Sequence, residues 1–162
     1  MNKLKLDQTD HQILNMLIES TRTPFTDIAK KLMISAGTVH VRVKKMEDAG
    51  IITGSSLSLN YEKLGYTFIA FVGIFLEKTS QTQFVMNRIH EIPFITVAHI
   101  TTGKFNLFCK IRAKNTDHAK RVIFKIDDIE GVHRTETMIS LEESLNDKKR
   151  LMHTIFEEMN EI

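Results

Sequence analysis

The period of the hydrophobic pattern changes once, near residue 50, and this change constrains the fold more than any other feature of the chain. Before it, apolar residues recur every three or four positions, which is typical of helices that bury one face. After it, short apolar runs alternate with polar segments, which favours strands joined by further helices. A chain of 162 residues has room for two small domains of these two kinds.

The first part predicts three short helices. Asp7 is placed to cap the first helix. Thr23 is expected to cap the second, with Pro24 at its first helical position, where the missing N–H costs nothing. Ser35 is expected to cap the third, which ends at Gly50. A tight turn between the second and third helices makes this a helix-turn-helix.

The third helix has two different faces. Val39, Val43 and Met46 share one side of a helical wheel and are expected to face the core. The opposite side is polar and basic, and residues 28–46 hold five basic side chains and no acidic one. Residues 65–162 hold 13 basic and 13 acidic side chains and so carry no net charge. The small net charge of +2 is therefore compatible with a local basic patch at residues 28–46. Such a patch suits a nucleic-acid surface, although a helical hairpin that binds protein, or a solvated lysine-rich face, shows the same pattern.

Most residues of this surface have an expected role, and Lys30 and Lys31 are expected to reach the flanking DNA backbone. Ser35 and Thr38 are expected to contact phosphate at the helix N-terminus, and Lys44 and Lys45 farther along it. Arg42 is expected either to contact phosphate or to brace the domain. His40 and Val41 are the expected base contacts, with Val41 able to pack on a thymine methyl group. The complete predicted DNA-binding set is Lys30, Lys31, Ser35, Ala36, Gly37, Thr38, His40, Val41, Arg42, Lys44 and Lys45.

The second part predicts a β-α-β-β-α-β order, which is the ferredoxin-like pattern. The expected strands are 66–76, 94–102, 105–113 and 132–141, with helices at 81–91 and 116–128. An earlier strand is expected at 52–59, and an amphipathic helix with Leu151, Ile155, Phe156 and Met159 on one side at 145–159. The predicted class is therefore α+β. Its divisions are a winged-helix-like helix-turn-helix domain at 1–52, strand and linker at 53–65, and a ferredoxin-like domain with a C-terminal helix at 66–162.

The run 68–76 is apolar on both faces of the strand it predicts. Two helices cover only one face of a ferredoxin-like sheet, so the other face needs a second cover. A second copy of the same sheet is the simplest one and would give a symmetric dimer. A dimer also supplies the two DNA half-sites that a helix-turn-helix commonly uses.

The ordered motifs of the chain resemble those of the leucine-responsive regulator/AsnC (Lrp/AsnC, feast/famine) family of transcription factors over nearly its whole length. The pieces that carry the resemblance are Leu6-Asp7-Gln-Thr-Asp10-His-Gln-Ile13-Leu14, Arg22 with Ile28-Ala29-Lys-Lys-Leu32, Ile34-Ser35-Ala-Gly-Thr38-Val39-His-Val-Arg42-Val43-Lys-Lys-Met46-Glu-Asp-Ala-Gly50-Ile-Ile52, and Thr101-Thr102-Gly103-Lys-Phe-Asn106-Leu.

This resemblance implies sequence-specific binding of double-stranded DNA by a homodimer, with octamers as a further assembly. It also implies an amino-acid effector at an interface between dimers, near the hairpin that follows the second ferredoxin-like strand. Gly103 is expected to permit the tight turn there, and hydroxyl and backbone groups to hold the amino acid. Family members commonly carry Asp where this chain has Asn106, which implies a hydrogen bond rather than an ion pair to an ammonium group. The implied pocket residues are Thr101, Thr102, Gly103, Lys104, Asn106, Thr135 and Thr137.

Two other functions share parts of this pattern. An architectural DNA-binding protein of low sequence specificity would use the same basic helix. A sirohaem-decarboxylase-like enzyme has the same two-domain architecture, and His99 and His133 lie on strands near the implied pocket. No His-Glu-x-x-His, glycine-rich phosphate loop or Gly-x-Ser-x-Gly pattern is present, so no catalytic residue and no metal ligand is predicted.

Cys109 is the single cysteine, which excludes an intrachain disulfide, and its alternation with Leu107 and Ile111 predicts a core position. The longest apolar run has nine residues, below the ~18 that a membrane helix needs. With no signal-like start, the expected location is the cytoplasm, with no membrane partner and no cofactor beyond the effector.

Overall fold

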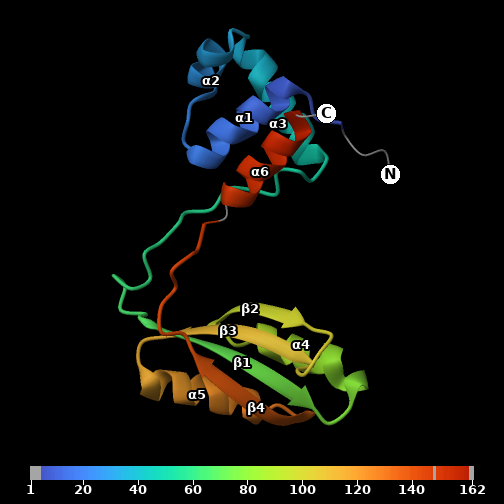
Figure 1. Cartoon of the computed structure of the whole chain (residues 1–162), viewed down its shortest axis with the longest axis vertical. Coiled ribbons are helices and arrows are strands. Elements are labelled where there is room, and N and C mark those ends of the chain that lie inside the picture. Colours follow the sequence, from blue (N-terminus) through green and yellow to red (C-terminus); the bar gives the residue numbers. More distant parts are fainter. Residues whose placement is uncertain (1–4, 148, 161–162) are drawn as a thin grey trace. The chain divides into compact units, whose positions relative to one another are not determined.

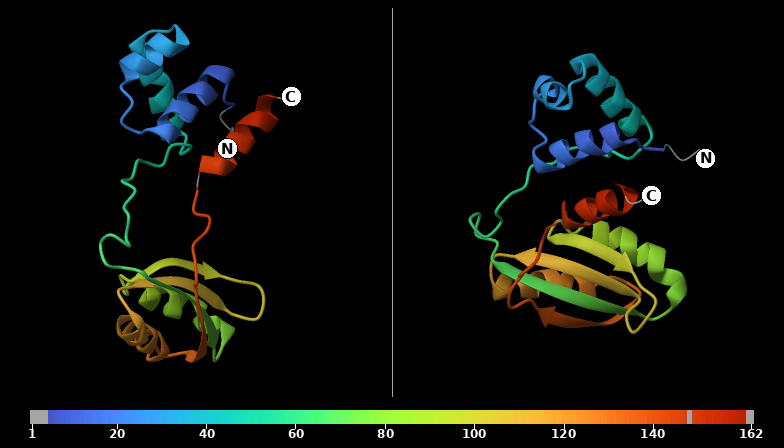
Figure 2. Two further views of the ribbon diagram at one scale, coloured as in Figure 1. Left: turned by 60° about the vertical axis from the view of Figure 1, so that its left-hand side comes forward. Right: turned by 45° about the horizontal axis from the view of Figure 1, so that its top comes forward.

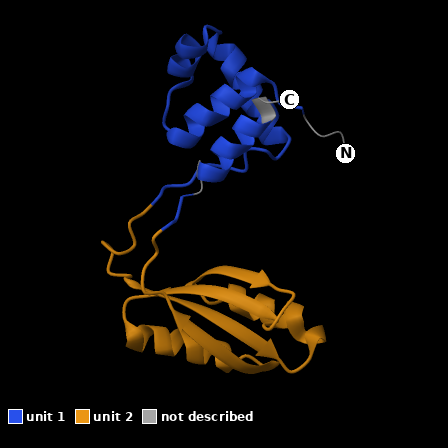
Figure 3. Ribbon diagram, in the orientation of Figure 1, with its two compact units in different colours: residues 1–58, 145–162 blue, residues 59–144 orange. Residues whose placement is uncertain are grey.

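The computed structural model describes residues 5–147 and 149–160. The chain forms two compact units, which Figure 3 colours separately. The helical unit comprises residues 1–58 and 145–162, and the sheet unit comprises residues 59–144. Each unit has its own hydrophobic core.

The helical unit packs four helices around one core (Figure 1). Ile13, Ile28, Val39 and Met46 are fully buried at its centre. The inward stripe predicted for the third helix is therefore confirmed. The helices are α1 (Gln8–Glu19), α2 (Phe25–Leu32), α3 (Ala36–Asp48) and α6 (Lys149–Asn160).

Local capping groups set where these helices begin and end. Asp7 caps α1, and its carboxylate accepts from the Asp10 backbone N–H at 2.9 Å. Ser35 caps α3 in the same way, accepting from the Thr38 N–H at 2.9 Å. Met33 ends α2 in the left-handed conformation, and Gly50 follows α3 with a φ of +70°. These starts and stops agree with the sequence patterns.

The cap of α2 differs by one residue from the prediction. Pro24 occupies the N-cap position, and its carbonyl accepts from the N–H groups of Asp27 and Ile28. Thr23 does not cap the helix, because its hydroxyl donates to the Ser20 carbonyl at 2.9 Å.

The sheet unit has four strands in the order β2-β3-β1-β4, with every neighbouring pair antiparallel. Both of its α-helices lie on one face of the sheet (Figures 1 and 2). This is the predicted ferredoxin-like arrangement, with strand and helix ends shifted by a few residues. Its elements are β1 (Phe68–Leu76), a 3-10 turn η1 (Thr79–Gln81), α4 (Thr82–His90), β2 (Ile95–Ile100), β3 (Leu107–Ala113), α5 (Thr116–Asp127) and β4 (Val132–Ile139).

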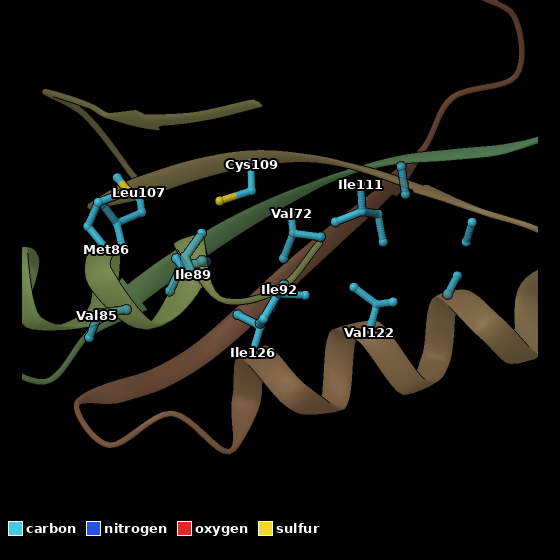
Figure 4. Close-up of a cluster of buried hydrophobic side chains, with 14 residues drawn as sticks. Val72, Val85, Met86, Ile89, Ile92, Leu107, Cys109, Ile111, Val122 and Ile126 are labelled. Carbon is cyan, nitrogen blue, oxygen red and sulfur yellow. The ribbon is translucent and has the colours of Figure 1, made fainter. Parts of the chain in front are cut away.

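The core of this unit lies between the sheet and its helices (Figure 4). Val72 and Cys109 point from paired strands toward Ile89 of α4 and Ile126 of α5. Burial raises the pKa of the Cys109 thiol to about 11. The predicted core role of this cysteine is confirmed.

The opposite face of the sheet, here called the open face, carries aromatic side chains. Phe71 stacks on Phe108 with ring centroids 5.8 Å apart, and Phe75 meets Phe105 edge-on at 5.2 Å. Phe71 and Phe75 are only half-buried. Both faces of β1 are therefore apolar, as its sequence predicts, and the second copy that would cover the open face stays a prediction.

The strand predicted at 52–59 is absent from the described part of the chain, and this prediction is corrected. Residues 53–60 have no regular secondary structure and are exposed, including Leu57 and Leu59. Alternation alone cannot make a strand, because the backbone groups need a paired strand and the described residues include none beside the segment.

The C-terminal helix also differs from the prediction. It begins at Lys149 rather than 145, and it belongs to the helical unit instead of extending the ferredoxin-like domain. Phe156 is buried and stacks on the His11 ring of α1 at 5.2 Å, which explains the assignment. Leu151 is 67% exposed and so is not part of the buried stripe, and the Met159 side chain lies outside the described residues.

Candidate DNA-binding surface and effector loop

Helix α3 presents a polar surface with one exposed apolar residue on the side away from the core. Thr38, His40, Lys44 and Lys45 are exposed there, and Val41 is 67% exposed. His40 also contacts the Phe25 ring of α2 edge-on at 6.0 Å. An exposed Val among donors and cations matches a surface that meets base edges and thymine methyl groups.

The N-terminus of α3 borders a concavity of about 600 Å³. Ser35 and Thr38 share a hydroxyl–hydroxyl hydrogen bond of 2.8 Å at its edge. The first N–H groups of a helix and its dipole attract anions, so this edge suits a phosphate. The lining residues are Asp7, Ser35, Gly37, Thr38, Val41, Arg42 and Lys45.

The lysines of this unit differ in their partners. Lys44 pairs with Asp48 at 2.9 Å, and that hydrogen bond raises the pKa of the Lys44 ammonium group. Among the residues that the structure describes, Lys30, Lys31 and Lys45 make no ion pair. Their ammonium groups are therefore not held by a carboxylate of the described residues at ion-pair distance.

Arg42 is held within the protein. Its Nη1 atom donates to Asp7 Oδ2 at 2.7 Å and to Asp10 Oδ1 at 2.8 Å. The carboxylates of Asp10 and Asp7 raise the pKa of the Arg42 guanidinium, and the Arg42 hydrogen bond lowers the pKa of Asp7. Of the two roles predicted for this side chain, the geometry matches the brace.

The β2–β3 hairpin is fixed to β1 through Asn106. The Asn106 N–H donates to the Ile74 carbonyl at 3.0 Å, and its Oδ1 accepts from the Leu76 N–H at 2.9 Å. The Thr101 hydroxyl donates to the Phe105 carbonyl at 2.6 Å within the loop. The Asn106 side-chain oxygen thus holds the end of β1 in place.

Gly103 does not adopt the left-handed conformation that its predicted turn role suggested. Its φ lies outside the positive range, and an added Cβ would meet no atom within 4 Å. The glycine needed for this region is Gly73 of β1, where an added Cβ would lie 2.4 Å from the Phe105 ring.

Thr135 and Thr137 lie apart from the hairpin loop. They pair with Ile74 and Val72, whose side chains belong to the core on the helix-covered face. Thr135 donates to Asp127 of α5 at 2.8 Å. The structure does not bring these two threonines together with Lys104 and Asn106.

Alternate residues of the same strand do meet the loop. Glu136 pairs with Lys104 of the hairpin and, at 2.8 Å, with Arg134. The Lys104 hydrogen bond is the main cause that lowers the pKa of Glu136. Arg134 also lies 3.7 Å from the centroid of the Phe75 ring. We call Lys104, Arg134 and Glu136 the charged cluster. Side chains alternate between the two faces of a strand, so residues 134 and 136 lie on the opposite face from residues 135 and 137. This alternation is the sequence signal that could have pointed to Arg134 and Glu136.

The described residues contain no group of three or more His, Cys, Asp or Glu side chains placed to hold a metal ion. His99 and His133 are both exposed on their strands. Within the described residues, no helix combines the length and apolar character needed to cross a membrane.

Comparisons with known proteins match both units. Residues 6–53 match the family described as winged helix-turn-helix DNA-binding, and residues 69–149 match the Lrp/AsnC ligand binding domain. The regulatory protein AsnC of Escherichia coli K12 is 34% identical over 143 residues, covering 88% of this chain and 94% of that protein.

Solved structures give the same result. The structure of Escherichia coli AsnC superposes with a TM-score of 0.86 and 32% identity, covering 90% of this chain and 98% of that one. A transcriptional regulator of Neisseria meningitidis, solved with L-methionine, has a TM-score of 0.83 at 20% identity, covering 89% and 95%. A feast or famine regulatory protein of Mycobacterium tuberculosis complexed with L-methionine has a TM-score of 0.81 at 24% identity, covering 89% and 97%. With its helix-turn-helix and its ferredoxin-like ligand-binding domain, this chain belongs to the Lrp/AsnC family of DNA-binding transcriptional regulators.

Proposed function

We propose that the protein binds specific double-stranded DNA sequences as a homodimer, with α3 in the major groove. The exposed polar face of α3, with projecting Val41 and with Lys45 held by no carboxylate of the described residues at ion-pair distance, is the observation that carries this proposal. An α-helix fits the major groove, where each base pair shows a distinct pattern of donors, acceptors and methyl groups.

The proposed contacts are of two kinds: phosphate contacts that position the protein on the DNA, and base contacts that read its sequence. Ser35 and Thr38, at the N-terminus of α3, bind a phosphate together with the helix dipole. Lys30, Lys31 and Lys45 reach flanking phosphates, and these contacts fix the register without reading sequence. Lys44 exchanges Asp48 for a phosphate at little cost, because an exposed ion pair contributes only about 0–1 kcal/mol. His40 and Val41 read base edges.

We further propose that an amino acid binds beside the β2–β3 hairpin and changes DNA binding. The charged cluster offers both signs, with Lys104 and Arg134 for an α-carboxylate and Glu136 for an α-ammonium group. The L-methionine complexes of the two structural neighbours support an amino acid as the effector class. Ligand binding alters DNA occupancy only if the amino acid binds the DNA-bound and DNA-free forms with different affinities, and we place that difference in the contacts between dimers.

The test begins with selection of bound duplexes from random-sequence DNA, followed by fluorescence-anisotropy titration of the enriched site. Excess nonspecific DNA is present throughout, and titrations run with and without a pool of the twenty amino acids. We expect competitor-resistant binding whose midpoint shifts with the pool. No enriched sequence would favour a low-specificity architectural protein, and specific binding with no shift would refute the effector.

A Lys45→Ala variant tests the phosphate contact. We expect weaker binding to all sequences and a salt slope smaller by about one, because one fewer phosphate is neutralised. Lys63→Ala is the matched control, since Lys63 is an exposed lysine of the sheet unit. Equal slopes for Lys45→Ala and parent would contradict the contact.

A further inference from the structure

Arg42 joins two helices that are distant in sequence. It lies on α3, 35 residues after Asp7 and 32 after Asp10, and one nitrogen atom bonds to both carboxylates. The Asp10 side chain is only 5% exposed and that of Arg42 is 28% exposed. The lysines of the same unit that we propose to contact phosphate are by contrast exposed.

The same two carboxylates form the capping box of α1. Asp7 Oδ1 accepts from the Asp10 N–H at 2.9 Å, and Asp10 Oδ2 accepts from the Asp7 N–H at 3.1 Å. The other oxygen of each carboxylate accepts from Arg42. All four carboxylate oxygens therefore have one partner each, and the first turn of α1 and the middle of α3 share one hydrogen-bonded unit.

The charge of this unit argues against a phosphate contact by Arg42. One guanidinium and two carboxylates carry a formal charge of −1, since the pKa of Asp7 is lowered and that of Arg42 is raised. The Nη1 atom can donate to a phosphate only if it leaves Asp7 and Asp10, and a buried carboxylate without its cation is unfavourable.

We propose that Arg42 is a positioning residue, which fixes α3 against the N-terminus of α1 and so sets the direction in which the DNA-reading face points. It contacts no phosphate itself. This inference rests on the proposed DNA binding by α3, and it removes Arg42 from the set of predicted DNA contacts.

Asp10→Asn separates the two roles by the sign of its effect. Removing an acidic charge close to DNA raises affinity if Arg42 contacts phosphate, because the arginine is then freed from a competitor. If Arg42 positions α3, the same change weakens its anchor, and we expect DNA affinity to fall about tenfold. Affinity is measured by anisotropy on the selected duplex, and circular dichroism checks that the variant is folded.

Two further variants complete the test. Arg42→Met with Asp7→Asn keeps the local formal charge at −1, and asparagine still caps α1. We expect this double variant to lose affinity while its salt slope equals that of the parent. It also carries the test if Asp10→Asn fails to fold, and circular dichroism checks its folding too, because the buried Asp10 carboxylate lacks its cation in this variant. Asp27→Asn is the matched control, because Asp27 is an exposed acid in the first turn of α2 and no contact with Arg42 is present. Its affinity should equal or slightly exceed that of the parent.

The outcomes separate this inference from the proposed function. A parent protein that binds no DNA would refute both. A parent that binds, with higher affinity for Asp10→Asn and a salt slope reduced by about one in the double variant, would refute only the positioning role. Lower affinity at an unchanged slope would support it.

Discussion

Replacing Gly73 with alanine should destabilise the sheet unit, although its backbone φ accommodates alanine. The added Cβ would lie 2.4 Å from two carbons of the Phe105 ring and 2.6 Å from a third. Ordinary carbon contacts are about 3.5–4.0 Å, so the ring must move by more than an ångström. Phe105 is held against Phe75 at 5.2 Å and Phe108 at 5.9 Å, which leaves it little room.

The expected magnitude is a balance of two effects. Overpacking of this kind costs about 1–3 kcal/mol. Alanine also restricts the unfolded chain, which returns about 0.4–1 kcal/mol. We therefore expect a net loss of about 1–2 kcal/mol, or a urea midpoint lower by about 0.5–2 M at slopes of ~1–2 kcal/mol/M.

Tyrosine fluorescence during urea unfolding measures this loss. The chain has no Trp, and its two tyrosines, Tyr61 and Tyr66, both lie in the sheet unit. Gly37→Ala in α3 is the matched control, followed by far-UV circular dichroism. Its Cβ would meet only Ser35 Oγ at 3.7 Å, so it should gain about 0.5–1 kcal/mol.

A double-mutant cycle tests the cause. Phe105→Ala removes the ring that the new Cβ meets, so Gly73→Ala should cost less in that background than in the parent. Equal stability of Gly73→Ala and parent, or strict additivity with Phe105→Ala, would show that the Cβ does not clash with the Phe105 ring.

Burial and charge determine how three further sites should respond to chemical modification, substitution and pH. Native Cys109, buried with its pKa raised to about 11, should react with a disulfide reagent at pH 8 far more slowly than in urea; equal rates would contradict its core position. Phe156→Ala should destabilise the helical unit by about 3–5 kcal/mol, whereas Leu151→Ala, at an exposed position, should change it by less than about 0.5 kcal/mol, both measured by far-UV circular dichroism. Because Arg42 lowers the pKa of Asp7 in the folded protein, the contribution of that carboxylate should be complete above its ordinary pKa of 3.8 and disappear as pH falls through the lowered value. Urea midpoints of parent and Asp7→Asn should thus converge below pH 4, and a constant difference from pH 6 to 2.5 would contradict the pairing.

Features set by local chemistry could be predicted from the sequence. The caps at Asp7 and Ser35, the stop at Gly50 and the inward face of α3 each depend on residues within one or two helical turns. The ferredoxin-like arrangement also followed, because few topologies fit strands and helices in this β-α-β-β-α-β order.

Features that depend on residues distant in the sequence could not be predicted. The segment 52–59 alternates like a strand, but pairing depends on a second backbone that the described part of the chain does not place beside it. The amphipathic pattern of α6 predicted a buried face but did not show which of the two cores that face joins. The contact of Phe156 with His11 of α1 places it in the core of the helical unit.

The candidate sites divide in the same way. The exposed side chains of α3 followed from helical periodicity, because its inward face was identifiable. Thr135 and Thr137 were implied by the family resemblance, and the sequence did not show that they pair with Ile74 and Val72 on the helix-covered face, away from the hairpin loop. The choice between brace and phosphate contact for Arg42 required the position of Asp10, 32 residues away.

Dimethyl sulfate footprinting on the selected duplex tests most directly whether α3 reads the major groove. The reagent methylates guanine N7, which faces the major groove, and adenine N3, which faces the minor groove. If α3 lies in the major groove, guanine N7 should be protected in two groups about 10–10.5 base pairs apart, or a multiple of that distance. In Lys45→Ala this protection should disappear only at higher salt. Protection confined to adenine N3, or none at a concentration that saturates anisotropy, would contradict this placement of α3.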